Sequence, residues 1–421
     1  MNGADAFMYI DHDGETRLVG SLWISSDRRG TMSCTFRYAE SWIDYGNAFA
    51  IDPWLDLSSG GPFHKDRLFG AIADSAPDRW GRTLIARSER LRARKRGKTP
   101  RHLNDLDYVL AVSDLTRHGA LRFALAEGGD FAAPPDDAEV PPLLALPHLM
   151  AAAQGFLDNP DSEEDLNILL APGSSLGGAR PKASVIDDDG RLSMAKFPKN
   201  DDAYSVSAWE HLALELARAA GISAAESRLL SIDARDVILL PRFDREGTRR
   251  IPFLSAMSAM DAVDQEPRSY LEIAEALRRF GASTRSDLRE LWRRIVFNVL
   301  ISNTDDHLRN HGLLYAGSGG WRLSPAYDLN PIPANIKPRF LSTAIGVDPE
   351  DTTASLELAF AVAEYFDMEE DEARVIAHEV GEVTRDWADR AHAVGIKRSE
   401  IDIMTSAFEH EDLVVALGGS W

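Results

Sequence analysis

The order of hydrophobic patterns along the chain limits its possible folds more than any other feature. Two short β-type runs, at residues 182–186 and 192–197, are followed by an amphipathic helical pattern over residues 207–220. A buried strand pattern follows at residues 237–240, and beyond Asp287 apolar residues recur every three or four positions. A hairpin, a helix and a further strand ahead of a long helical region predict a mixed α+β fold.

The first 125 residues have a different texture, rich in strand patterns with some helix. Residues 18–24 and 34–38 alternate apolar and polar side chains, as half-buried strands do. Residues 74–91 form a helical pattern that opens with a turn at 75–78. Two proline pairs between residues 127 and 147 disfavour both a helix and a central strand. We therefore expect a β-rich N-terminal part that a linker joins to the rest.

Size and composition narrow the class of protein. A chain of 421 residues is long enough for two or three domains, and its net charge of −21 opposes wrapping nucleic acid or lying on an anionic membrane with the whole surface. The single cysteine, Cys34, excludes a disulfide scaffold and a cysteine-rich metal site. Neither a signal-peptide pattern nor an apolar run of about 18 residues is present, so we expect a cytoplasmic protein with no membrane partner.

A dense polar cluster at residues 303–311 directly follows a strongly apolar helical pattern. Its sequence, Asn-Thr-Asp-Asp-His-Leu-Arg-Asn-His, is too polar for a core and is typical of a loop that carries catalytic groups. Asp305 is followed by Asn310 in the cluster and then by Asp328 beyond a short hairpin pattern. Phosphoryl transfer uses this arrangement, because one carboxylate accepts the proton of the attacking hydroxyl while an amide and a second carboxylate hold Mg²⁺ on the phosphates.

Two other interpretations of the cluster are open at this stage. Asp and Asn side chains also cap helices and shape turns, so each of these residues could be structural. His307 and His311 have the spacing of metal ligands on one helix face, although Leu308 occupies the position where the metal-hydrolase pattern has glutamate.

A glycine- and serine-rich loop at residues 173–182 could bring backbone N–H groups close to phosphates. It is not a P-loop, because no Gly-Lys-Ser/Thr follows at the required spacing. Lys196 follows on the second strand of the expected hairpin, where an apolar context requires a partner charge or a phosphate. Glu210 on the next helix is its expected ion-pair partner. The alternatives are an edge-strand lysine that opposes aggregation and a solvated helix glutamate.

In this order, the motifs resemble the HipA family of bacterial serine/threonine protein kinases, the toxins of HipBA toxin–antitoxin modules. The resemblance covers nearly the whole chain, although the linker and the last seventy residues match only in general character. The stretches that carry it are Pro77–Arg82, Gly119–Phe123, Gly173–Lys182, Ala195–Pro198, Arg242–Arg245, Asn303–Asn310 and Ser324–Asp328.

The resemblance implies a two-lobed protein-kinase-like α+β fold, with a β-rich N-terminal subdomain and a mainly helical C-terminal lobe. Its expected parts are a HipA N-terminal-like domain (1–126), a linker (127–148), a kinase-like N-lobe part with an ATP-covering loop (149–250) and a helical C-lobe with the catalytic and metal-binding motifs (251–421).

The resemblance also implies cofactors and roles for individual residues. ATP and Mg²⁺ are expected, with Asp305 as catalytic base, Asn310 and Asp328 as metal ligands, and a Lys196–Glu210 ion pair. The expected ATP-binding residues are Gly177, Gly178, Ala179, Arg180, Pro181, Lys182, Lys196, Pro241, Arg242, Phe243, His307, Asn310, Tyr327 and Asp328. The family's autophosphorylated loop serine aligns with Ser175, and Ser174 is the second candidate.

Two departures from the family's pattern affect these roles. Pro241 stands in the hinge where we expect an acidic residue, and it offers adenine a carbonyl but no N–H. After Asp328, Leu329 and Asn330 replace the Phe-Gly of other kinases, so the phenylalanine packing of those enzymes does not transfer.

The family's partners are a protein substrate, often an aminoacyl-tRNA synthetase, and HipB, a small helix-turn-helix antitoxin. We expect both here, with DNA reached only through the antitoxin. The alternative function is a catalytically silent kinase-like corepressor that acts with the DNA-binding partner. A local group of basic residues could meet a phosphate backbone, a tRNA or an acidic protein surface, or be a solvated helix end. Its members are Arg87, Arg90, Arg92, Arg94, Lys95, Arg96, Lys98 and Arg101.

Overall fold

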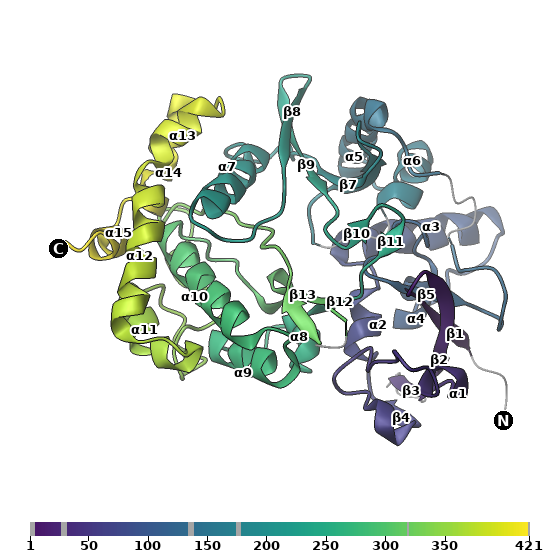
Figure 1. Cartoon of the computed structure of the whole chain (residues 1–421). Helices are drawn as coiled ribbons and strands as arrows, with labels where there is room; N and C mark the ends of the chain where they lie inside the picture. The colour runs from purple at the N-terminus through teal and green to yellow at the C-terminus, as the bar shows by residue number, and fades with distance from the viewer. Residues whose placement is uncertain (1–4, 27–31, 134–138, 174–177, 318–319, 420–421) are drawn as a thin grey trace. The chain divides into compact units, whose positions relative to one another are not determined.

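The structure is a computed structural model that describes residues 5–26, 32–133, 139–173, 178–317 and 320–419. The chain divides into two compact units. Unit 1 comprises residues 1–201 and 239–254, and unit 2 comprises residues 202–238 and 255–421. The chain returns to unit 1 within β9 (Arg235–Pro241) and leaves it again within β12 (Phe253–Ser255), so each unit is assembled from separated parts of the sequence (Figure 1).

Unit 1 is built on a five-stranded antiparallel sheet in the order β4-β3-β2-β1-β5. Its strands are β1 (Ala6–His12), β2 (Glu15–Ser26), β3 (Met32–Tyr38), β4 (Phe63–Lys65) and β5 (Leu121–Ala124). The strands predicted at 18–24 and 34–38 are confirmed, because they lie within β2 and β3. Alternate side chains such as Met8 and Ile10 are fully buried, so one face of the sheet forms the core of this part of unit 1.

Helices accompany this sheet and extend unit 1 along the sequence. They are α1 (Glu40–Ile43), η1 (Leu57–Ser59), α2 (Gly70–Asp74), α3 (Arg79–Lys95), α4 (Asp105–Leu110), η2 (Leu143–Ala145), α5 (Leu146–Asp158) and α6 (Glu163–Gly173). The helix predicted within residues 74–91, after a turn at 75–78, is confirmed as α3, which begins at Arg79 and continues to Lys95, while Asp74 ends the short helix α2. The last residues of the expected linker form η2 and the start of α5.

A second sheet in unit 1 contains the predicted hairpin. β6 (Lys182–Ile186) and β7 (Leu192–Lys196) pair antiparallel, and the end of β9 runs along the other side of β7, where Arg242 N donates to Leu192 O at 2.9 Å. The short strands β10 (Arg245–Glu246) and β11 (Arg249–Arg250) follow β9. Because β7 has a neighbour on both sides, Lys196 is not an edge-strand lysine, and that alternative is wrong.

Unit 2 is mainly helical, as predicted (Figure 1). Its helices are α7 (Val206–Ala219), α8 (Ala256–Ala259), α9 (Tyr270–Phe280), α10 (Thr284–Leu300), η3 (Leu308–Asn310), α11 (Leu356–Ala361), η4 (Ala363–Phe366), α12 (Glu370–Arg385), α13 (Trp387–Ala393), α14 (Arg398–Phe408) and α15 (Glu411–Ala416). β8 (Arg228–Ile232) precedes β9, and β13 (Gly312–Tyr315) pairs antiparallel with β14 (Trp321–Leu323).

The amphipathic patterns explain which faces of these helices are buried. On α10 the predicted stripe of Leu288, Leu291, Trp292, Ile295 and Val299 is fully buried. α13 and α14 are separated at Gly395, whose positive φ of 88° is a backbone conformation that glycine adopts readily. Among the described residues, no helix is long and apolar enough to cross a membrane.

Candidate active site

The polar cluster forms a tight loop at the end of α10 in unit 2, and it presents Asp305 to solvent. The backbone carbonyl of Asp305 accepts hydrogen bonds from His307 N at 2.9 Å and from Asn310 Nδ2 at 3.1 Å. No hydrogen bond or ion pair between described residues uses the Asp305 carboxylate. The fold therefore fixes the backbone of this residue while its carboxylate is left available to accept a proton.

The adjacent Asp306 has the opposite environment, since it is buried and one of its carboxylate oxygens has three hydrogen-bond partners. Its Oδ2 accepts from the Tyr270 hydroxyl at 2.5 Å and from Asn298 Nδ2 at 2.7 Å, and it lies 2.8 Å from His311 Nε2. The Thr343 hydroxyl donates to its backbone carbonyl at 2.7 Å. Burial acts to raise the pKa of Asp306, but the charge and hydrogen bond of His311 and the Tyr270 hydrogen bond outweigh burial and lower it.

These contacts decide the role of His311. Its Nε2 is committed to the buried Asp306 carboxylate, which makes it part of the support for the loop. Among the described residues, no three His, Cys, Asp or Glu side chains are gathered so that they could hold a metal ion. The interpretation of His307 and His311 as a hydrolase metal site therefore has no support in the geometry.

The two predicted metal ligands lie on segments of unit 2 that a chain of asparagines connects. Asn330 Nδ2 donates to Asp328 Oδ1 at 3.2 Å, and Asn330 N donates to Asn303 Oδ1 at 3.1 Å, directly before the Asp305 loop. Asn303 Nδ2 in turn donates to Asn298 Oδ1 at 3.0 Å. This chain of hydrogen bonds fixes the Asp328 segment to the loop that carries the candidate base.

The donor chemistry of these two residues suits a hard cation. Asn310 is buried and uses its amide nitrogen on the Asp305 carbonyl, so its amide oxygen is the atom that could bind a metal. Asp328 has a left-handed backbone, with φ of 58°, a conformation that is uncommon for residues other than glycine but that aspartate tolerates better than most. An amide oxygen and a carboxylate fit Mg²⁺, which takes few protein ligands and completes its shell with phosphate and water oxygens.

His307 and Tyr327, predicted to lie near the nucleotide, are both half-buried in unit 2. The Tyr327 hydroxyl donates to the Arg309 carbonyl at 2.5 Å, which fixes the segment before Asp328 against the loop. The Nδ1 atom of His307 is buried and has no hydrogen-bond partner among the described residues.

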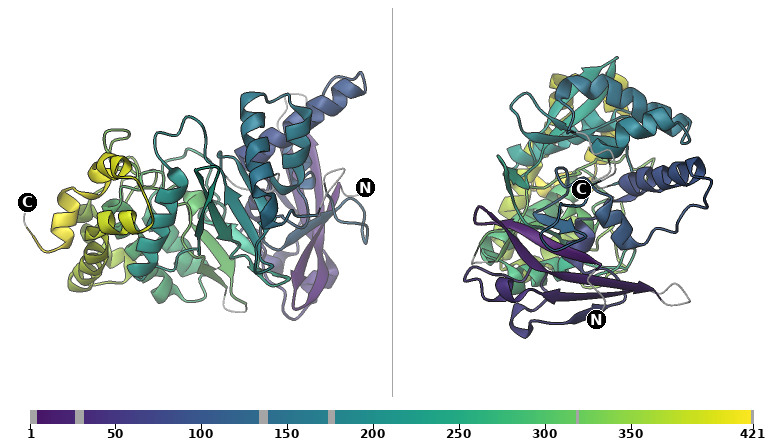
Figure 2. Two further views of the ribbon diagram at one scale, coloured as in Figure 1. Left: turned by 90° about the horizontal axis from the view of Figure 1, so that it is seen from above. Right: turned by 90° about the vertical axis from the view of Figure 1, so that its right-hand side faces the viewer.

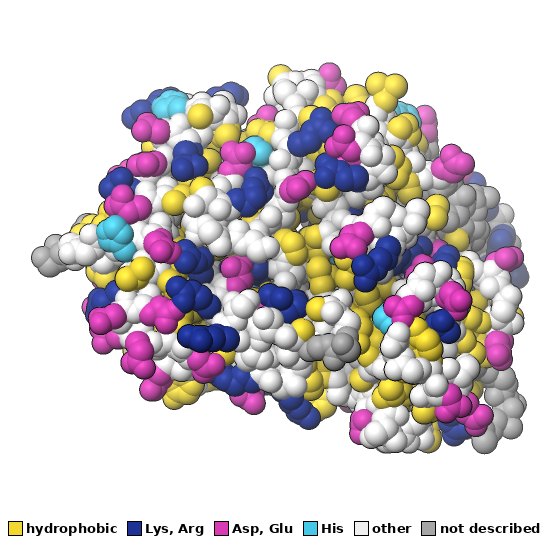
Figure 3. Space-filling model, in the orientation of Figure 1, with side chains coloured by type: hydrophobic (Ala, Val, Ile, Leu, Met, Phe, Trp, Pro, Cys, Tyr) yellow, Lys and Arg dark blue, Asp and Glu magenta, His cyan; other side chains and the backbone are white. Residues whose placement is uncertain are grey.

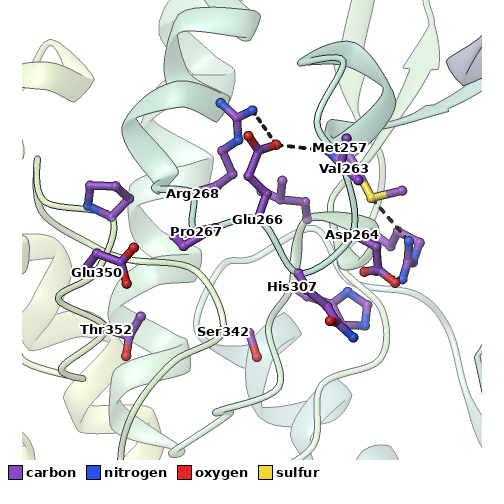
Figure 4. A pocket seen from close by; sticks show the side chains of 14 residues that line it. Met257, Val263, Asp264, Glu266, Pro267, Arg268, His307, Ser342, Glu350 and Thr352 are labelled. Carbon is purple, nitrogen blue, oxygen red and sulfur yellow. Dashed lines mark hydrogen bonds and ion pairs between the residues drawn. The ribbon is translucent and has the colours of Figure 1, made fainter. Parts of the chain in front are cut away.

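A pocket of about 480 Å³ opens beside the Asp305 loop (Figure 4). His307 and Ser342 are among the residues that line it. The Ser342 hydroxyl donates to the Thr304 carbonyl at 3.1 Å. Glu350 lies across the opening from His307 in this view (Figure 4). Thr304, the residue before the candidate base, is thus connected by a hydrogen bond to the pocket wall, and residues 307–309 of the same loop line the pocket.

Unit 1 carries the predicted phosphate-binding residues. Lys182 on β6 is paired in register with Lys196 on β7, and both lysines are buried. Two lysines side by side in a sheet repel each other, and a negatively charged ligand is attracted to such a pair. A Cβ atom at Gly178 would lie 2.6 Å from Lys182 Nζ, so the glycine leaves room for that ammonium group. This arrangement is suited to phosphate oxygens.

The helix α3 holds the end of the glycine-rich loop in place. The Asp78 carboxylate accepts from Gly178 N at 2.6 Å, and Trp80 N donates to Gly178 O at 3.2 Å. The Trp80 indole N–H donates to Lys182 O at 3.0 Å. We call these three hydrogen bonds the α3 clamp. In the sequence, Asp78 and Trp80 belonged to a stretch that resembles the family, but nothing predicted their hydrogen bonds to Gly178 and Lys182.

The predicted hinge, Pro241–Phe243, is half-buried and lies next to a buried charge cluster in unit 1. Asp244 accepts from Gly119 N at 2.7 Å, from Arg242 Nε at 2.7 Å and from Arg245 Nη1 at 2.9 Å. Burial acts to raise the pKa of Asp244, but the two guanidinium groups outweigh it and hold the pKa far below its usual range. Because the Arg242 guanidinium is engaged here, a contribution of Arg242 to adenine binding would come from its backbone.

Several other predicted site residues can be placed within single units. Ala179 is exposed, Arg180 half-buried and Pro181 buried, all in unit 1. Glu210 is buried on α7 in unit 2, so its interpretation as a solvated position is wrong, while its pairing with Lys196 of unit 1 stays a prediction. Gly177, Ser174 and Ser175 lie outside the described residues.

Comparison with known proteins identifies the family. Residues 174–388 match the HipA-like C-terminal domain, and residues 14–100 match the HipA N-terminal domain. The chain belongs to the HipA family. HipA of Shewanella oneidensis, solved with HipB and operator DNA, has a similar fold, with a TM-score of 0.64 over 98% of this chain and 96% of that one. At 14% identity this likeness concerns the fold alone, and it confirms the predicted α+β, kinase-like class.

Three curated relatives are provisionally named kinases. Y4mE of Sinorhizobium fredii is 23% identical over 341 residues, which cover 74% of this HipA-family chain and 74% of Y4mE. Y4dM of the same organism is 29% identical over 230 residues, and a Haemophilus influenzae protein is 24% identical over 178 residues. These matches cover 47% and 37% of this chain, respectively. This chain spans about half the length of the latter two, 52% in each case.

Proposed function

We propose that this HipA-family protein is an ATP-dependent serine/threonine protein kinase. The observation that carries the proposal is the contrast between two adjacent carboxylates. Asp306 is buried and anchors the loop, whereas Asp305 is exposed and its carboxylate makes no hydrogen bond to a described residue. A general base needs an accessible carboxylate on a backbone that does not move, and this loop supplies both.

In the proposed mechanism, Asp305 accepts the proton of a substrate hydroxyl as the hydroxyl oxygen attacks the terminal phosphate of ATP. The Asn310 amide oxygen and the Asp328 carboxylate would hold Mg²⁺, which when bound neutralises charge on the phosphates. The buried pair Lys182 and Lys196 would hold phosphate oxygens. The segment beginning at Gly178, held by the α3 clamp, would cover them.

The substrate and the biological setting follow from the family. We propose that the substrate is a protein of the translation machinery, such as an aminoacyl-tRNA synthetase, and that its phosphorylation inhibits growth. The pocket beside Asp305 would receive the chain around the acceptor hydroxyl. The Shewanella relative was solved with HipB and operator DNA, which supports a HipB-like antitoxin as partner. A catalytically silent corepressor would not need an exposed Asp305 carboxylate on a loop that buried hydrogen bonds hold in place.

The decisive experiment is phosphate transfer from radiolabelled ATP to proteins of a host lysate, with mass spectrometry of the labelled band. We expect label on Ser or Thr, and we expect Asp305→Ala to lower the rate by about 100-fold or more. Full activity of the Asp305→Ala protein would rule out this residue as the base. Label on His or Asp alone would rule out the proposed acceptor class.

Inactivating autophosphorylation at Ser175 or Ser174 is the second part of the proposal. Phosphate would add up to about two negative charges beside the residues that are proposed to bind ATP phosphates. We expect incubation with Mg·ATP to add phosphate to wild type but to neither Asp305→Ala nor the Ser174→Ala/Ser175→Ala protein, as intact mass would show. Unchanged affinity of the phosphorylated protein for an ATP analogue would contradict inactivation by this route.

A further inference from the structure

The end of α3 carries a group of positive side chains that phosphate transfer does not use. Eight basic residues lie between Arg87 and Arg101, in a chain whose net charge is −21. Three of the eight pair with acidic side chains of unit 1, in the pairs Arg87–Asp161, Lys95–Glu163 and Arg101–Asp107. These three cations contribute to packing α3 and its following loop against the rest of unit 1.

The other five cations form no ion pair with a described residue. They are Arg90, Arg92, Arg94, Arg96 and Lys98, and we call them the α3 basic patch. Arg92 is half-buried and the other four are exposed. Arg90 and Arg94 are one helical turn apart, so they lie on the same face of the helix. This end of α3 projects from its neighbours in unit 1 (Figure 2).

Helix stability alone does not account for the patch. Cations in the last turn of a helix interact favourably with the helix dipole, and Arg92, Arg94 and Lys95 occupy that turn. Arg90 precedes the turn, and Arg96 and Lys98 follow the helix. On the face shown in Figure 3, by contrast, Lys and Arg side chains lie among Asp and Glu side chains. A polyanion would be repelled by most of this acidic protein and attracted at the patch.

The chain segment that carries the patch favours a nucleic acid over a protein as its partner. Stable protein interfaces are centred on apolar or aromatic anchors. Among the described residues between Trp54 and Leu115, no large hydrophobic side chain is exposed, and Leu91 and Ala93 within the patch are buried. A phosphate backbone requires only cations that can displace its counterions. We propose that the α3 basic patch binds the phosphate backbone of a nucleic acid, independently of the antitoxin.

Salt dependence tests this proposal directly, without using kinase activity. The full-length protein, with no antitoxin present, is titrated into a fluorescent DNA duplex of about 20 base pairs and into a fluorescent RNA hairpin, at several salt concentrations. Anisotropy gives the affinity for each probe. Five phosphate contacts predict that log K falls with log salt with a slope of about −4.5 for the duplex. The probe that binds more tightly identifies the natural nucleic acid as DNA or RNA.

Two variants with the same change in charge make the test specific. Arg90→Gln/Arg94→Gln/Arg96→Gln should reduce the magnitude of the slope by about 3 and weaken binding at low salt. The matched control replaces three exposed arginines of unit 2, in Arg374→Gln/Arg385→Gln/Arg398→Gln, and should bind like wild type. The proposal is overturned if neither probe binds wild type at low salt, or if both triple variants lose affinity equally.

Discussion

Replacing Asp306 by alanine should destabilise unit 2 strongly, whereas the same change at the adjacent Asp305 should leave its stability almost unchanged. Asp306→Ala removes the shared acceptor of the Tyr270 hydroxyl, the Asn298 amide and the His311 imidazole, all of which are buried. Because these polar groups are buried, losing their shared acceptor is costly. Asp305→Ala removes an exposed side chain that is bound to no described residue.

The magnitude follows from the number and burial of these contacts. A hydrogen bond to a charged group contributes about 1.5–3 kcal/mol, and three bonds that share one carboxylate are not additive. Removing one partner from a buried charged network costs about 3–5 kcal/mol. For a unit of this size, that range corresponds to a Tm lower by roughly 6–20 °C. An exposed substitution such as Asp305→Ala should change stability by no more than about 0.5 kcal/mol.

The two variants must be compared by thermal melting as well as by phosphate transfer, because both are expected to be inactive. Only Asp306→Ala should melt early, and only Asp305→Ala should be inactive while fully folded. Asp306→Asn should be intermediate, since its amide oxygen still accepts one of the hydrogen bonds. A Tm for Asp306→Ala within about 1 °C of wild type would refute the assignment of Asp306 as the anchor.

The lowered pKa of Asp306 adds a pH dependence with a defined sign. Its stabilising contribution is fully present above its unfolded pKa of about 4, and is lost as pH falls through the lower folded pKa. Wild-type Tm should therefore drop more steeply than that of Asp306→Ala as pH falls below about 4. Parallel Tm profiles for the two proteins in acid would contradict this linkage.

Three further predictions concern the metal, the nucleotide loop and the hinge. Stabilisation by ATP, measured as a rise in Tm, should require Mg²⁺ and should weaken in Asp328→Ala. The same rise in Tm with and without a chelator would count against a metal at this residue. Trp80→Phe removes the N–H that donates to Lys182 O, so KM for ATP should rise by roughly fivefold with little change in kcat. An unchanged KM would show that the α3 clamp does not position the loop. Asp244→Ala should lower the stability of unit 1 by about 3–5 kcal/mol, whereas Glu246→Ala, in an exposed ion pair, should change it by less than about 1 kcal/mol. Similar losses for the two variants would contradict the stabilising role of the charge cluster around Asp244.

The sequence predicted the parts of the fold that depend on local periodicity. The strand at 34–38, the hairpin at 182–197 and the helix at 207–220 could be predicted because each buries a face that repeats at a fixed spacing. The Asp305, Asn310 and Asp328 spacing likewise indicated residues that unit 2 connects through hydrogen bonds.

Contacts between distant residues could not be predicted in this way. The motif singled out Asp305, but nothing in the sequence showed that Asp306 is buried, because its role depends on Tyr270 and Thr343, each more than thirty positions away along the chain. The edge-strand alternative for Lys196 was wrong for a similar reason, because β9, the second neighbour of β7, returns from a separate part of the chain. Periodicity reports which face of an element is buried, but not which other element covers it.

The return of the chain to unit 1 at residues 239–254 has a practical consequence for anyone who wishes to study the units separately. A fragment truncated at residue 201 would lack the end of β9 and would leave β7, with Lys196, as an open strand edge prone to pair with other molecules. Separate production of unit 1 would require residues 239–254 to be rejoined to residue 201 by a designed loop. Limited proteolysis within residues 202–238 should likewise yield two fragments that stay associated, because each fragment supplies part of unit 1.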